Sequence, residues 1–175
     1  MIDTSRLYLP DPARAAGTNC GSLEAFQTLL KRSQEDPDGF WADVASELEW
    51  IRPWDAVREG DFPHFKYFVG GVSNPTLNLI DRHLASGAGN RLALIWEGED
   101  GQTRFYTYRM LAAEVNRCAN VLKRLGVGKG DAVAIFTPNL SEAVTAVLAC
   151  FRIGALFNTV FSGFSARSLD RKSVV

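Results

Sequence analysis

Few side chains in this sequence have the type and spacing that chemistry requires. The two histidines, His64 and His83, could each act as a general acid or base or as a metal ligand. No motif connects either of them to a serine or cysteine nucleophile, so we expect both to be structural. The three cysteines are too few and too far apart for a disulfide framework or a zinc site; they are Cys20, Cys118 and Cys150. We therefore expect free thiols, no metal site and no catalytic residue.

Two clusters resemble binding sites but have simpler interpretations. Glu97, Glu99 and Asp100 surround glycines in a turn and lack metal-ligand spacing, so we expect a solvated hairpin tip. The run from Gly126 to Asp131 suggests a phosphate loop, but it fits neither GxGxxG nor GxxxxGKS/T. It also follows a predicted helix and precedes a predicted strand, which is the wrong order for such a loop. We interpret it as a helix cap followed by a turn.

The elements of the first part are helices and an extended segment. Residues 1–21 show little periodicity and predict an irregular lead-in. Ser22 is a typical N-cap of a short helix, and Asp36-Pro37 begins another with proline at its first position. Residues 50–74 hold six aromatic residues but neither helical nor strand periodicity. Burying a large ring contributes about 1.5–3 kcal/mol, so we expect this segment to be strapped across a larger body. Base stacking on these rings is the alternative, which the scarcity of interleaved cations disfavours.

A helix, a hairpin and a longer helix follow. Asn74-Pro75 opens the first helix, on which the Asp81-Arg82 pair has a predicted capping or packing role. Residues 91–96 and 104–107, separated by a glycine-containing turn, predict a β-hairpin. Thr107 is the predicted N-cap of a helix whose apolar residues recur at a 3.6-residue period. This stripe consists of Leu111, Val115, Cys118, Ala119, Leu122 and Leu125.

The last elements predict a βαβ unit. Residues 132–136 are apolar without alternation, which is typical of a strand covered on both faces. A helix from Ser141 ends at Gly154, and residues 155–160 form the next strand, so the two strands should be parallel with a right-handed crossover. The fold class is therefore α/β. Asn139 follows the carboxyl end of the first strand, where open α/β sheets bind ligands, and is a candidate binding residue. The alternative is that Asn139 only forms an ordinary turn beside Pro138.

Composition and charge exclude several classes of protein. The 175 residues are 46% apolar and 22% charged, which is typical of a globular protein of about one domain. A net charge of −1 argues against a nucleic-acid partner, because nucleic-acid binders usually carry a basic excess. No apolar run reaches the roughly 18 residues of a membrane span, and residues 1–6 lack the apolar core of a signal peptide. We therefore expect a cytoplasmic protein with no membrane partner.

Six segments occur in the order in which one enzyme family has them. They are Trp50–Trp54, Leu77–Leu84, Ile95–Glu99, Gly128–Ile135, Leu148–Ala155 and Phe161–Ser165. Together they resemble the N-terminal region of AMP-forming acetyl-CoA synthetases and their short-chain acyl-CoA relatives, in the adenylate-forming superfamily. The resemblance runs from about Phe40 to Leu169. Each segment is moderately specific, but six in the right order are hard to obtain by chance.

The resemblance implies a ligase reaction with ATP, Mg and CoA. A carboxylate such as acetate or propionate attacks the α-phosphate of Mg-ATP, giving an acyl-adenylate and pyrophosphate, and the CoA thiol then displaces AMP. Both steps concentrate negative charge. The family meets it with a Ser/Thr/Gly-rich loop followed by lysine, a downstream aspartate and a lysine of a mobile C-terminal domain. None of these motifs occurs in the 175 residues, so this chain alone is expected to be inactive and to bind none of these cofactors productively.

One family segment with a binding role is present. The family's Phe-Gly-Gly-Phe-Ser segment lies against the CoA adenine, and the matching residues here are Phe161, Ser162, Gly163, Phe164 and Ser165. Ser162 replaces the usual glycine, and its added bulk changes how closely the nucleotide can approach. The alternative is a turn that needs Gly163 for its backbone, and the sequence favours neither.

The chain is thus divided into four parts. Residues 1–21 are the lead-in, 22–90 the acetyl-CoA-synthetase-like helical and extended segment, 91–169 the truncated start of an AMP-binding domain, and 170–175 a suspected sequencing-adapter translation. The last part can be back-translated as gat cgg aag agc gtc gtg, which matches a widely used adapter, although a natural tail would read the same. We expect an N-terminal fragment with an incomplete fold. The alternative is a complete small α/β nucleotide-binding, CoA-binding or scaffold module without catalysis.

Overall fold

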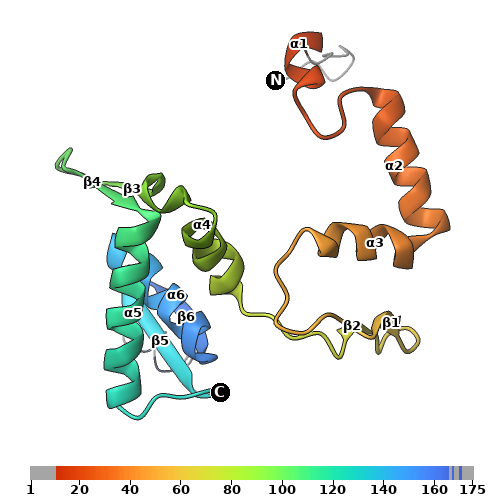
Figure 1. Ribbon diagram of the computed structural model, residues 1–175. Coiled ribbons are helices and arrows are strands. Elements are labelled where there is room, and N and C mark those ends of the chain that lie inside the picture. The colour runs from red at the N-terminus through yellow and green to blue at the C-terminus, as the bar shows by residue number, and fades with distance from the viewer. Residues whose placement is uncertain (1–10, 166, 168–169, 171–175) are drawn as a thin grey trace. The chain divides into compact units, whose positions relative to one another are not determined.

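The computed structural model describes residues 11–165, Arg167 and Asp170 (Figure 1). Residues 1–10 of the lead-in and 171–175 of the suspected adapter lie outside the described residues. The chain divides into two compact units. The first draws on residues 1–48 and 54–69, and the second on residues 49–53 and 70–175.

Helices dominate the first unit. They are α1 (Pro12–Ala16), α2 (Leu23–Glu35) and α3 (Pro37–Ser46). The predicted caps are confirmed, because the side chains of Ser22 and Asp36 accept hydrogen bonds from backbone N–H groups of α2 and α3 at 3.1 and 3.0 Å. The expectation of an irregular lead-in is wrong at α1. Asp11 caps this helix and Pro12 occupies its first turn, so it begins with the same Asp-Pro signal as α3.

A hairpin corrects the expectation that residues 50–74 lack regular structure. The strands β1 (Ala56–Glu59) and β2 (Lys66–Val69) are antiparallel, with Ala56 opposite Val69. In each strand, two adjacent residues are partly buried and the other two are exposed, instead of every second residue being buried. The sequence therefore lacks the alternation of apolar and polar residues by which a half-buried strand is predicted. The rings of Trp54 and Phe68 pack edge to face at 5.4 Å, whereas Phe62 stays 87% exposed. Not every ring of this segment is therefore buried.

The second unit begins with helical turns and a second hairpin. Its elements here are η1 (Leu77–Asp81, a π-helix), α4 (Arg82–Ala85), η2 (Ala88–Asn90, a 3₁₀ helix), β3 (Leu92–Glu97) and β4 (Thr103–Thr107). The helix predicted after Asn74-Pro75 therefore contains a π-helical turn. Asn74 Oδ1 accepts hydrogen bonds from both the N–H and the hydroxyl of buried Thr76, at 2.9 and 2.8 Å. The strands β3 and β4 pair antiparallel, which confirms the predicted hairpin.

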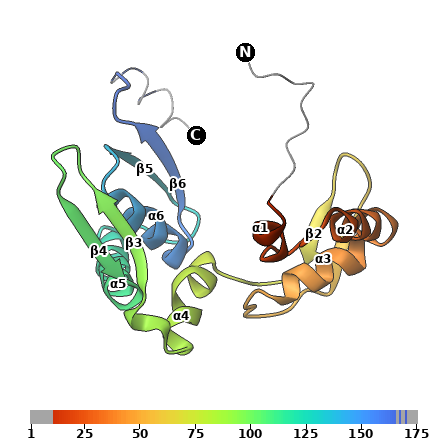
Figure 2. The same ribbon diagram turned by 90° about the horizontal axis from the view of Figure 1, so that it is seen from above.

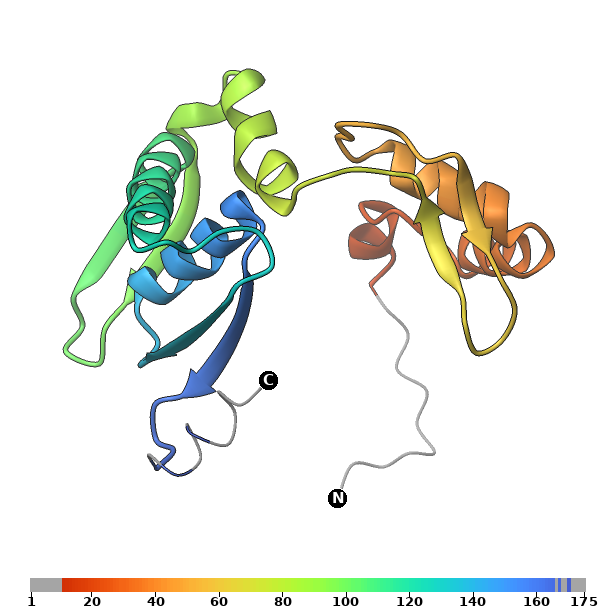
Figure 3. The ribbon, with the colours of Figure 1, turned by 90° about the horizontal axis from the view of Figure 1, so that it is seen from below.

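A βαβ unit completes the second unit. It follows α5 (Tyr108–Arg124) and consists of β5 (Ala132–Thr137), α6 (Ser141–Ile153) and β6 (Leu156–Phe161). The two strands are parallel, in register from Ala132 opposite Leu156 to Thr137 opposite Phe161, as predicted. The expectation that β5 is covered on both faces is wrong, because Phe136 is 41% exposed. Among the described elements only α6 packs extensively on this strand pair, and α5 runs along α6 (Figure 3).

The core of the second unit lies where η1, α5 and α6 meet. Its buried residues are Ile80, Leu111, Ala112, Val115 and Leu148. Leu94 and Tyr106 of the hairpin pack against this cluster, and Figure 2 shows the hairpin beside α5. The core therefore joins the hairpin and the βαβ unit into one α/β body. In the part of the chain that the structure describes, no helix has the length and apolarity needed to cross a membrane.

Candidate functional site

The carboxyl edge of β5 and β6 brings two loops together. Thr137 and Phe161 are opposite each other in the parallel register, so the residues that follow them leave the sheet side by side. We use the name carboxyl edge for residues 137–139 and 161–164. Open α/β sheets bind ligands at this end of their strands, and both candidate binding segments of the sequence lie here.

Phe161 and Phe164 form an exposed pair of rings at this edge. Their centroids lie 5.7 Å apart with an interplanar angle of 79°. The N–H of Phe164 donates to the carbonyl of Phe161 at 3.0 Å, which closes a tight turn around Ser162 and Gly163. Phe161 is 66% exposed and Phe164 is 44% exposed. Two exposed rings that are inclined to each other offer a surface on which a flat aromatic group can stack.

A ring lies close to the glycine of this turn. A Cβ atom added to Gly163 would lie 2.6 Å from Cε1 of Phe161. Gly163 is not among the residues with positive φ, so the idea that the turn needs glycine for its backbone conformation is wrong. Ser162 also avoids positive φ and is exposed, so serine replaces the family's glycine there without backbone strain.

Two hollows of different charge flank Phe161. One, of about 430 Å³, lies between the ends of β5 and β6 and includes Asn139 and Phe164 in its lining, with no charged side chain. The other, of about 730 Å³, has Ser162 on one wall and the hairpin tip on the other. That tip contributes the carboxylates of Glu97, Glu99 and Asp100. All three carboxylate residues are exposed, which confirms the predicted solvated tip.

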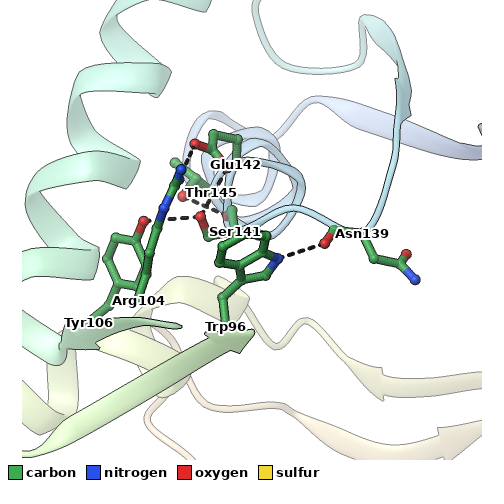
Figure 4. A network of polar contacts seen from close by, with 7 residues as sticks. All are labelled: Trp96, Arg104, Tyr106, Asn139, Ser141, Glu142 and Thr145. Carbon is green, nitrogen blue, oxygen red and sulfur yellow. Dashed lines mark hydrogen bonds and ion pairs between the residues drawn. The ribbon is translucent and has the colours of Figure 1, made fainter. Parts of the chain in front are cut away.

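A polar network fixes the hairpin to the loop and helix that begin at this edge (Figure 4). Trp96 Nε1 donates to the carbonyl oxygen of Asn139 at 2.7 Å. Arg104 lies over the Trp96 ring, 4.9 Å from its centroid, and pairs with Glu142 at 2.9 Å. The side-chain amide of Asn139 points away from these groups (Figure 4). The main chain of Asn139 therefore has a structural partner, and its side chain lies at the candidate site.

Ser141 is the buried centre of this network. Its hydroxyl donates to Glu142 Oε2 at 2.9 Å. A hydroxyl has one hydrogen, so Tyr106 must be the donor in the 3.0 Å contact between its hydroxyl and Ser141 Oγ. The Glu142 backbone N–H and the Ser141 hydroxyl lower the pKa of the Glu142 carboxyl, and Arg104 adds to the effect. Sequence reasoning missed this network, because its members come from β3, β4, the loop after β5 and α6, which are far apart in the sequence.

The other candidates of the sequence are not among the residues of the carboxyl edge. His64 is exposed in the first unit, and His83 stacks on Tyr108 in the second with ring centroids 4.3 Å apart. Cys118 and Cys150 are free thiols whose pKa is raised by burial. Across residues 11–165, 167 and 170, no three His, Cys, Asp or Glu side chains are grouped so that they could hold a metal ion.

Hydrogen bonds test two further predictions, one for the turn from Gly126 to Asp131 and one for Asp81. Asp131 Oδ2 accepts from the N–H of Gly128 at 2.8 Å, and Gly126 has a φ of 89°, so the cap-and-turn interpretation is confirmed. The predicted capping role of Asp81 is wrong, because its side chain makes no capping hydrogen bond to the helix that follows, and the predicted packing role is supported by a contact with α6. Both of its carboxylate oxygens accept from Arg152, at 2.9 and 3.0 Å, although the two residues are 71 positions apart in the sequence. The sequence alone cannot show such a long-range partner.

The sequence of this chain is similar to those of known enzymes. Residues 26–79 match the family model described as acetyl-coenzyme A synthetase N-terminus, and residues 81–171 match the AMP-binding enzyme family. The acetyl-coenzyme A synthetase of Deinococcus radiodurans is 43% identical over 169 residues, which are 97% of this chain and 26% of that protein. Those of Gemmatimonas aurantiaca and Chlorobaculum tepidum are 50% and 38% identical, over 97% and 98% of this chain.

The coverage of these relatives limits what the match establishes. This chain spans about a quarter of their length, 25% to 26%. The predicted boundary at residue 90 and the role of Phe161–Phe164 stay predictions. The AMP-binding family model nevertheless covers more than half of the chain, including α5, both parallel strands and α6. The chain belongs to the family of AMP-binding enzymes, and acetyl-coenzyme A synthetases are among its relatives.

Proposed function

We propose that this chain carries the CoA-adenine platform of an AMP-forming ligase for a short carboxylic acid. In the reaction of such a ligase, a carboxylate and ATP give an acyl-adenylate and pyrophosphate. The CoA thiol then displaces AMP and forms the thioester. The contribution of this chain is Phe161, Ser162, Gly163 and Phe164, which would hold the adenine of CoA at the carboxyl edge.

The observation that carries this proposal is the angled, exposed ring pair of Phe161 and Phe164. Adenine is flat, aromatic and uncharged, so it can stack on one ring while the edge of the other bounds it. The turn keeps this surface open, because Gly163 has no side chain to displace the Phe161 ring. The residues present therefore fit an adenine base.

The charge of the two hollows favours one orientation of CoA. The 430 Å³ hollow beside Phe164 has no charged lining, whereas the 730 Å³ hollow is bounded by three carboxylates of the hairpin tip. Those carboxylates would repel the phosphates of CoA. We place the adenine in the uncharged hollow, with the phosphates directed away from Glu97, Glu99 and Asp100.

The sequence motif with which such ligases hold ATP does not occur in these 175 residues. The sequence has no Ser/Thr/Gly-rich loop followed by lysine to hold a triphosphate. The phosphoryl chemistry of the first step depends on such donors and on Mg²⁺. We therefore propose that the 175-residue chain alone does not turn over ATP, acid and CoA. Acetate or propionate is the proposed substrate of the complete enzyme.

The CoA platform is tested by nuclear magnetic resonance with CoA as the probe. CoA should shift the ring resonances of Phe161 and Phe164, and pantetheine, which lacks adenine, should not. One stacked base contributes roughly 1–3 kcal/mol, so the dissociation constant should be on the order of millimolar or weaker. Phe161→Ala should abolish the shifts, and Phe105→Ala, at an exposed ring on β4, should preserve them.

Three results would count against the proposal. Equal shifts with pantetheine, or unchanged shifts in Phe161→Ala, would remove the adenine platform. Micromolar CoA binding by the isolated chain would instead favour the alternative of a self-contained binding module. Formation of a thioester from acetate, ATP and CoA by the 175-residue chain would overturn the proposed inactivity.

A further inference from the structure

A third hollow, of about 580 Å³, lies at the opposite end of β5 and β6 from the two rings. Its walls are the last turns of α5, the turn that leads into β5 and the end of α6. The latter two segments directly precede the two strands, so the hollow lies at the amino edge of the sheet. The proposed ligase reaction does not use it.

The lining of this hollow is basic and rich in amides. Asn116, Asn120 and Lys123 come from α5, where their spacing of four and three residues places them on one face. Lys129 comes from the turn before β5, and Arg152 comes from the last turn of α6. None of the residues that line the hollow is acidic.

Two of the three cations lack an ion-pair partner among the described residues. The guanidinium of Arg152 is paired with both carboxylate oxygens of Asp81. Lys123 and Lys129 have no ion pair with any carboxylate in the part of the chain that the structure describes. The hollow therefore presents two ammonium groups beside two amide side chains.

Helix-end electrostatics explains only some of this arrangement. Lys123 and Arg152 lie in the last turns of α5 and α6, where cations stabilise the helix dipole. Lys129 belongs to no helix. Its side chain packs over Gly154, where an added Cβ would lie 3.2 Å from Lys129 Cγ, and the backbone of Gly130 donates to the Gly154 carbonyl at 3.0 Å. The turn thus holds a third cation against the same hollow.

We propose that this hollow is a binding site for a small phosphate-bearing anion. Its volume falls within the range of about 300–1,000 Å³ that is typical of small-molecule sites. Lysine ammonium groups make charge-assisted hydrogen bonds to phosphate oxygens, and the amides of Asn116 and Asn120 add neutral donors. No carboxylate lines this hollow, in contrast to the three at the hairpin tip, and the nearby carboxylates of Asp131 and Asp81 are each held by hydrogen bonds to a lining residue.

Equilibrium dialysis of the 175-residue chain against radiolabelled pyrophosphate, at constant ionic strength, tests the site. Binding should saturate at one pyrophosphate per chain. Lys123→Glu and Lys129→Glu should each weaken it at least about tenfold, because each change removes a donor and adds repulsion. Arg124→Glu is the matched control, since it makes the same charge change one residue along α5, at an exposed position outside the lining. It should change the dissociation constant by less than about twofold.

Two results would overturn the site. One is an equal weakening of pyrophosphate binding in Arg124→Glu, which would mean general electrostatic attraction, and the other is uptake that never saturates.

If a Lys→Glu variant has an altered circular dichroism spectrum, Lys129→Gln and Asn120→Ala are measured in its place. Unchanged pyrophosphate binding in both of these variants would also overturn the site. Phe161→Ala should retain pyrophosphate binding, because its ring lies at the carboxyl edge. This variant separates the anion site from the proposed CoA platform.

Discussion

The indole Nε1 of Trp96 donates a 2.7 Å hydrogen bond to the main-chain carbonyl of Asn139 (Figure 4). Trp96 lies near the end of β3, and Asn139 lies in the loop that follows β5. The bond therefore fixes the hairpin to one of the two loops at the carboxyl edge. Arg104 on β4 covers the same indole ring and pairs with Glu142 on α6, so the attachment has a second, electrostatic component.

Trp96→Phe tests the hydrogen bond within this attachment. Phenylalanine keeps a large ring for Arg104 to cover but has no donor, so we expect the free energy of unfolding to fall by about 1 kcal/mol. Urea unfolding followed by circular dichroism measures the change. Trp41→Phe, at a half-exposed ring on α3, is the control and should cost less than about 0.5 kcal/mol. Equal losses in the two variants would contradict the assigned role of Trp96.

The lowered pKa of Glu142 predicts how this attachment responds to pH. The folded state favours the carboxylate, so its contribution to stability is present above the unfolded pKa and is lost as pH falls through the folded pKa. Glu142→Gln should therefore lose less stability than the parent chain between about pH 7 and about pH 3. Urea midpoints across this range provide the measurement.

Ser141→Ala is the companion variant for this pH effect. Its hydroxyl donates to Glu142 and is one of the two principal causes of the lowered pKa, so its removal should reduce the pH dependence in part. A Glu142→Gln chain with the same acid sensitivity as the parent would place the effect elsewhere.

The bidentate pair of Asp81 and Arg152 predicts a larger loss than an exposed ion pair. The side chains are 36% and 23% exposed, so Asp81→Asn leaves a partly buried arginine with a weakened partner. We expect a loss of about 1–3 kcal/mol in the free energy of unfolding. Glu114→Gln removes the partner of Arg117 on the surface of α5 and should cost less than about 0.5 kcal/mol. Similar losses in the two variants would show that this partly buried pair contributes no more than a surface pair.

Local signals were sufficient to predict much of this fold. Ser22, Asp36 and Thr107 cap the helices that their sequences predict, because a capping side chain acts within three residues of its own position. The strand–helix–strand order likewise fixed which loops meet at the carboxyl edge. Both predictions depend on residues that are close in the sequence or on chain direction alone.

Long-range contacts could not be predicted in the same way. The pairing of Asp81 with Arg152 and the contact of Tyr106 with Ser141 depend on how η1 and β4 pack against α6, which no local pattern encodes. The hairpin of β1 and β2 was missed because its exposure does not alternate. The close approach of the Phe161 ring to Gly163 could not be predicted either, because it depends on the side-chain conformation within the turn.

Gly163→Ala separates ring geometry from overall stability at the carboxyl edge. The added methyl group would lie 2.6 Å from Phe161 Cε1, so the ring must move. Phe161 is 66% exposed and can turn into solvent, so we expect less than about 1 kcal/mol of lost stability. The edge-to-face contact with Phe164 should nevertheless disappear, together with the resonance shifts that CoA induces. Gly128→Ala is the control, because its Cβ would meet nothing closer than Asp131 Oδ2 at 3.8 Å. Persistence of the Phe161–Phe164 nuclear Overhauser contacts in Gly163→Ala would show that the turn tolerates a side chain there and that the ring pair does not depend on glycine.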